Sequence, residues 1–130
     1  MDKLQDITIT VVPDEQHQSG LSAQVLAILN EITAYLDELA RDGKEQSIDI
    51  RSLPLLPDEY QALKTVLGQG EVTATVSALG DSEIRETAIP GVWWITHRNS
   101  EDDVMAEFIE ITSIPAMLKS DQDDLDQAVK

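Results

Sequence analysis

The stretch EVTATVSALGDSEIRETAIPGVWWITHR, residues 71–98, decides the predicted fold because its apolar residues recur at every second position. In its first run, residues 72–78, valine and alanine alternate with threonine and serine, which is the period of a half-buried strand. The turn pairs GD (80–81) and PG (90–91) separate this run from two further ones, and a fourth run covers 104–111. We therefore predict an antiparallel meander of about four strands.

Two helices are predicted before this sheet. Residues 22–41 place isoleucine, leucine and valine at three- and four-residue steps, which makes one apolar stripe on a helix. Ser22 suits its N-cap and Gly43 suits the left-handed residue after its end. A second helix is expected to begin near Pro57 and to end at Gly68. Helices followed by strands predict an α+β fold, with the two helices packed on one face of the sheet.

The remaining segments set the domain boundaries. Residues 7–11 alternate like a strand, so they predict either an added N-terminal strand or a partly ordered arm. Residues 48–50 favour a short strand or an extended segment, and residues 114–118 favour a helical turn. We predict one domain over residues 1–118, and we expect the acidic tail 119–130 to fray.

Charge is the strongest signal in the composition. Twenty-five acidic residues against nine basic ones give a formal net charge of −16. Such a surface repels nucleic acid and anionic membranes, and it either serves solubility alone or attracts a basic partner. No apolar run approaches the roughly 20 residues of a membrane span, and the N-terminus lacks the pattern of a secretory signal. We therefore expect no nucleic acid or membrane partner and a cytoplasmic location.

Residue types that carry chemistry are scarce in this chain. It has no cysteine, and its two histidines, His17 and His97, form no local metal-ligand motif. No serine lies in a nucleophile elbow, and no glycine-rich loop precedes a helix as a phosphate site requires. We predict no enzyme activity, no catalytic residue, no cofactor and no metal site. A carboxylate site for a hard metal ion, or an acid–base enzyme, remains the alternative.

The strand pattern also predicts a surface. Glu83 and Arg85 share one face of their strand, and Glu86 points to the other. Trp93 and Trp94 fall on opposite faces, so one enters the core and the other lies on the far face, exposed or covered by another segment. An ordinary solvent-facing strand and a surface that pairs two copies of the domain are the alternatives. We predict a partner-binding surface made of Glu71, Glu83, Arg85, Glu86, Trp93 and Trp94.

Three segments resemble the HupH/HyaF family of hydrogenase expression and formation proteins. They are IDIRSLPL (48–55), LGQGEVTATVSALGDSEIRETAIPGVWW (67–94) and IEITSIPAML (109–118), and the similarity runs from about Val25 to Leu118. The resemblance implies a chaperone-like, non-enzymatic role in nickel-iron hydrogenase maturation. The implied partners are an immature hydrogenase subunit, with the small subunit favoured, and other maturation proteins. The family has no established catalytic residues to transfer.

Overall fold

The computed structural model describes residues 21–77 and 79–119. The predicted strand at 7–11 and nearly all of the predicted acidic tail lie outside these residues. The elements in chain order are α2 (Ala23–Asp42), β2 (Gln46–Asp49), η1 (Ile50–Ser52), α3 (Pro57–Leu67), β3 (Thr73–Ser77), β4 (Asp81–Glu86), β5 (Val92–Arg98), β6 (Val104–Ile111) and η2 (Ala116–Leu118).

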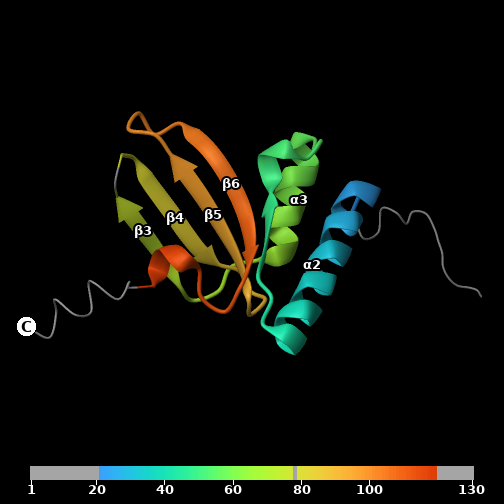
Figure 1. Cartoon of the computed structure of the whole chain (residues 1–130). Coiled ribbons are helices and arrows are strands. Elements are labelled where there is room, and N and C mark those ends of the chain that lie inside the picture. The colour runs from blue at the N-terminus through green and yellow to red at the C-terminus, as the bar shows by residue number, and fades with distance from the viewer. Residues whose placement is uncertain (1–20, 78, 120–130) are drawn as a thin grey trace, which may run out of the picture.

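The sheet confirms the predicted α+β architecture and adds one strand to it. Its order is β2-β6-β5-β4-β3, and every neighbouring pair is antiparallel. Strands β3 to β6 form the predicted meander, and both helices lie on the same side of it (Figure 1). The fifth strand, β2, pairs with the outer edge of β6, and Ile48 lies opposite Ile109.

Local hydrogen bonds explain where the helices begin and end. The Ser22 hydroxyl accepts from the amide of Val25 at 3.2 Å, and Gly43 takes the left-handed φ of 69° that ends α2. Pro57 occupies the first turn of α3, where its missing amide costs no hydrogen bond. The Glu59 carboxylate accepts from the amide of Leu56 at 2.9 Å, and this bond lowers the pKa of Glu59.

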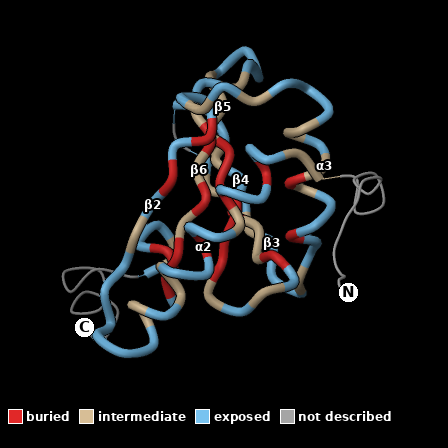
Figure 2. Tube along the Cα trace, turned by 90° about the vertical axis from the view of Figure 1, so that its right-hand side faces the viewer, coloured by how far each residue is buried: buried red, intermediate tan, exposed pale blue. Residues whose placement is uncertain are grey.

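The main core lies between the helices and the sheet. Figure 2 shows the buried segments running through the central strands β5 and β6. The buried side chains of this cluster are Val25, Ile28, Ile32, Ile48, Ile50, Leu63, Leu67, Val92, Trp94, Ile109 and Ile111. The stripe predicted on the first helix therefore supplies one wall of the core, and alternate residues of the meander supply the other.

The opposite side of the sheet, here called the far face, has a smaller core of its own. Ile84, Trp93 and Ile95 are buried there, with Val76 and Leu118 packed against them. Leu118 belongs to η2, the helical turn expected near the end of the domain. The two tryptophans do lie on opposite faces, but neither is exposed, because Trp93 is 5% and Trp94 2% accessible. The segment after β6 thus helps to cover the apolar side chains of the far face.

One predicted turn is placed differently. Asp81 already pairs with Ser77 as the first residue of β4, so the connection ends at Gly80 and the pair 80–81 does not form the turn. At Gly80, the backbone before β4 lies close to the backbone at the end of β5. A Cβ at this position would overlap the carbonyl of Arg98 and the backbone of Asn99.

We expect Gly80→Ala to lower the free energy of unfolding by at least ~2 kcal/mol, because the added methyl group forces two backbones apart. Gly43→Ala is the matched control, since a Cβ added there would meet nothing within 4 Å and only the left-handed φ opposes the change, at about 1 kcal/mol. Urea unfolding measures both. Equal losses in the two variants would contradict the close approach.

Candidate functional site

The helices leave part of their side of the sheet uncovered. Strands β3 and β4 and the end of β5 extend beyond α3, and their side chains on this side are polar. The register aligns one row as Thr75, Glu83, Thr96 and Glu107. It aligns the next row as Thr73, Arg85, Trp94 and Ile109. We call this surface the open face, defined by Thr73, Thr75, Glu83, Arg85 and Arg98; Thr96, in the same row as Glu83, is buried at 6% accessibility.

A buried carboxylate joins the open face to α3. Glu107, on β6, is only 7% accessible. Its Oε2 accepts from Trp94 Nε1 at 3.0 Å and from Thr96 Oγ1 at 3.0 Å. The Tyr60 hydroxyl, on α3, lies 2.8 Å from both carboxylate oxygens. Three donors from two elements satisfy this charge, so the network fixes how the helix sits on the sheet.

The sequence analysis missed Glu107. One signal could have found it, because Glu107 has the same strand parity as Ile109 and Ile111, which enter the core. A carboxylate at a core position needs buried donors. In the strand pairing, the donors beside it on the same face are the hydroxyl of Thr96 and the indole of Trp94.

Tyr60 responds to this environment. Burial, followed by the hydrogen bond and the charge of Glu107, raises the pKa of Tyr60 to about 12, while Arg85 and Arg98 oppose the shift. The Tyr60 ring meets the edge of Trp94 at 5.7 Å between centroids. The Lys64 ammonium lies 5.3 Å from the Trp94 centroid. One cation, Lys64, therefore contacts this aromatic cluster directly, and Arg85 and Arg98 act on Tyr60 through their charge.

Two cavities flank this cluster. One, of about 230 Å³, is charged and lined by Thr75, Asp81, Glu83, Arg98 and Asp102. The other, of about 270 Å³, combines apolar and polar side chains and is lined by Ile50, Arg51, Leu53, Leu55, Pro57, Tyr60 and Glu107. Tyr60 and Glu107 thus form part of the wall of this second hollow.

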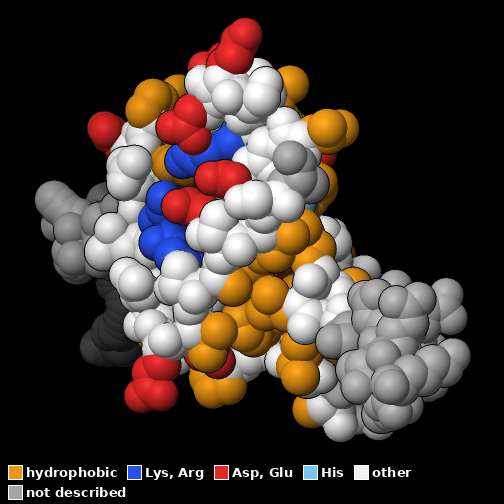
Figure 3. All heavy atoms as spheres, turned by 90° about the vertical axis from the view of Figure 1, so that its left-hand side faces the viewer, with side chains coloured by type: hydrophobic (Ala, Val, Ile, Leu, Met, Phe, Trp, Pro, Cys, Tyr) orange, Lys and Arg blue, Asp and Glu red, His pale blue; other side chains and the backbone are white. Residues whose placement is uncertain are grey.

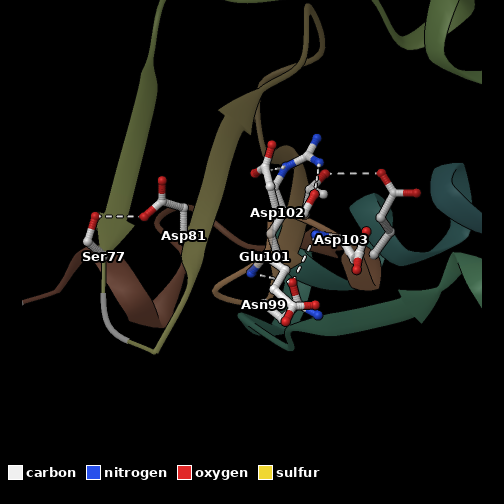
Figure 4. A network of polar contacts seen from close by, with 9 residues as sticks. Ser77, Asp81, Asn99, Glu101, Asp102 and Asp103 are labelled. Carbon is white, nitrogen blue, oxygen red and sulfur yellow. Dashed lines mark hydrogen bonds and ion pairs between the residues drawn. The ribbon is translucent and has the colours of Figure 1, made fainter.

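The β5–β6 hairpin holds its acidic groups in a defined turn. The Asn99 side chain accepts from the amides of Glu101 at 2.8 Å and Asp103 at 2.9 Å, as Figure 4 shows. The Arg98 guanidinium approaches Asp102 at 3.9 Å, and this exposed pair adds little stability. The turn therefore places several carboxylates at one end of the open face.

The six residues predicted as a partner-binding surface do not lie together. Only Glu83 and Arg85 share the open face with accessible side chains, and no ion pair joins them in the described part of the chain. Glu86 lies on the far face opposite Trp93, and Glu71 is exposed in the bend before β3. Trp93 and Trp94 are buried, because a helix covers one face and η2 the other. Their contribution to such a surface is therefore indirect.

A serine–histidine contact occurs on the far face. Ser82 Oγ lies 2.7 Å from His97 Nδ1, and the imidazole packs edge-on against Phe108 at 5.9 Å between centroids. Within residues 21–77 and 79–119, no carboxylate is hydrogen-bonded to this ring, and no group of three or more His, Asp or Glu side chains converges as a metal site. No helix in the same part of the chain is long and apolar enough to cross a membrane.

The Tyr60 pKa is directly testable, because the chain has two tyrosines and Tyr35→Phe leaves Tyr60 alone. We expect this variant to titrate near pH 12 by absorbance at 295 nm. Adding Glu107→Gln to this variant should lower the pKa of Tyr60, because it removes the neighbouring charge. Since the pKa is raised above 10.0, its stabilising contribution is complete below pH 10 and is lost as pH rises to about 12. If Tyr60 in the folded Tyr35→Phe variant titrates near pH 10, the result contradicts the hydrogen bond between Tyr60 and Glu107.

Removing the buried carboxylate tests its structural role. We expect Glu107→Ala to cost roughly 3 kcal/mol, because it leaves buried donors from Tyr60, Trp94 and Thr96 without an acceptor. Glu83→Ala, at an exposed position in the same row, should change stability by no more than about 0.5 kcal/mol. Thermal unfolding of both variants measures the difference, and similar losses would refute a special role for Glu107.

Comparison with known proteins identifies relatives of this chain. "Hydrogenase expression/formation protein HoxQ" of Azotobacter vinelandii is 31% identical over 84 residues, which are 65% of this chain and 30% of that protein. "Hydrogenase-1 operon protein HyaF" of Escherichia coli (strain K12) is 34% identical over 87 residues, with 65% of this chain and 30% of that protein covered. The chain thus spans about 30% of the length of these curated relatives.

A solved structure shares the fold. The "Hydrogenase expression protein HupH from Thiobacillus denitrificans ATCC 25259" matches with a TM-score of 0.77 at 42% identity, over 83% of this chain and 90% of that chain. The family model of the HupH hydrogenase expression protein, C-terminal conserved region, matches residues 23–130. The resemblance noted in the sequence is confirmed, and the chain belongs to the HupH C-terminal family of hydrogenase expression proteins.

Proposed function

We propose that this domain is a non-enzymatic accessory factor in the maturation of nickel-iron hydrogenase. It acts by binding an immature hydrogenase subunit, with the small subunit favoured, in the cytoplasm. Family membership and the names of the relatives support the link to hydrogenase formation. The observation that carries the binding role is the open face, a sheet surface beside the helices that no described element covers.

The composition of the open face suits a protein partner. Charged groups of both signs, Glu83, Arg85 and Arg98, stand among threonine hydroxyls. Mixed charge on a fixed platform gives specificity and orientation, because a partner must match the pattern of signs. The network around Glu107 keeps this platform rigid, so little conformational entropy is lost when a partner binds.

The whole-chain charge acts at longer range. A net charge of −16 attracts a partner surface that is basic overall, and the local cations Lys64 and Arg85 then select its acidic or aromatic groups. Salt within the physiological range screens the long-range part with a Debye length of about 8 Å. Association should therefore weaken as ionic strength rises.

Binding to purified hydrogenase precursors tests the proposal. We expect the wild-type chain to bind the small-subunit precursor more tightly than the large-subunit precursor, with an affinity that falls with salt. Glu83→Arg and Arg85→Glu should each weaken binding at least tenfold, because each reverses a charge on the open face. Calorimetry or biolayer interferometry measures the affinities.

The control is Arg41→Glu, an exposed charge reversal on α2 that breaks surface pairs with Asp37 and Asp42. It should bind like the wild type. Tryptophan variants are poor probes, because Trp93 and Trp94 are core residues. If neither precursor binds, or if the open-face variants behave like Arg41→Glu, the proposal is wrong.

A further inference from the structure

Strand β3 is an edge of the sheet with free main-chain groups. It pairs only with β4, and no described strand lies on its other side. The amide of Glu86 donates to the carbonyl of Val72 at 2.9 Å. Hydrogen-bonding direction alternates along an antiparallel strand, so Ala74 and Val76 also direct their main-chain groups toward β4. Thr73 and Thr75 direct theirs away from the sheet.

This edge lacks the features that usually block strand addition. Residues 73–77 read TATVS, with no charge and no proline, and all five residues keep a regular register with β4. The other edge differs, because β2 ends in Asp49 and runs directly into η1, where the Arg51 side chain donates to the carbonyl of Val104. Within the described residues, the β3 edge is therefore the longer and less charged of the two edges.

A strand added beside β3 would meet different side chains on the two faces of the sheet. On the helix side, Thr73 and Thr75 lie beside Arg85 and Glu83 of the open face. On the far face, Val76 packs with the apolar cluster that includes Leu118. Figure 3 looks onto this edge, with charged side chains gathered on one flank and hydrophobic side chains on the other. An added strand would alternate in the same way.

We propose that β3 receives an extended segment of the partner polypeptide as a sixth strand. The segment alternates apolar residues, which face the Val76 side, with basic or polar residues, which face Glu83 and the threonines. The net charge of −16 favours basic over acidic residues in this segment, and it disfavours a second copy of the chain. The inference rests on the proposed function, because the segment belongs to the immature subunit.

Substitutions at Thr75 test the edge without touching the inward hydrogen bonds. Thr75→Pro removes an outward amide donor, and Thr75→Lys keeps the donor but adds a charged, edge-protecting side chain. Thr65→Lys makes the same change at an exposed position of α3 and is the matched control. Circular dichroism verifies that each variant is folded.

The probe is the purified small-subunit precursor. We expect both Thr75 variants to bind it at least tenfold more weakly than Thr65→Lys. In the wild-type complex, hydrogen exchange at the amides of Thr73 and Thr75 should slow at least tenfold, because new cross-strand bonds protect them.

The outcomes separate the two proposals. If the wild type binds but the Thr75 variants bind equally well, or if the outward amides are not protected, the edge inference is wrong and the proposed function stands. If the wild type binds neither precursor, both fail. Sedimentation of the chain alone is the last measurement. If the chain forms a dimer and Thr75→Pro abolishes it, the added strand comes from a second copy of the chain. That result would overturn the proposal that a partner segment binds β3.

Discussion

The buried carboxylate of Glu107 is the constraint on which the rest of the structure depends. A carboxyl group at a core position of β6 is tolerated because Tyr60, Trp94 and Thr96 direct their donors at it. Those donors come from α3 and β5, so satisfying the charge also fixes the helix on the sheet. Burial of the neighbouring isoleucines stabilises the core but does not depend on direction. The hydrogen bonds of Glu107 are directional, so they set the position and angle of α3 on the sheet.

The incomplete cover of the sheet follows from its width. Two helices pack toward β5 and β6, while the meander continues through β4 to β3. The uncovered strands carry threonine and charged residues on the helix side, which need no cover. On the far face, where Ile84 and Trp93 are apolar, the segment after β6 returns to bury them. On this sheet, the buried apolar side chains of the far face are covered by the segment after β6, and the polar side chains of β3 and β4 on the helix side stay accessible.

Charge acts at two scales in this molecule. The whole chain is strongly acidic, and its net charge of −16 acts on charged groups at a distance. Near Trp94, however, the cations Lys64 and Arg85 occur together with the Glu107 carboxylate, so both signs of charge meet there.

The sequence by itself determined the order of elements, the antiparallel meander, the shared face of Glu83 and Arg85, and the family. These features depend on local periodicity and on long matching segments. Only the tertiary structure decided that β2 joins the edge of β6, that η2 covers Trp93, and that Glu107 collects donors from Tyr60 and Trp94. It also showed that the six predicted surface residues are divided among two faces, a bend and the core. Contacts between residues distant in the chain depend on how the helices and the sheet pack together. Strand alternation predicts on which face of the sheet a side chain lies, but not which element covers that face.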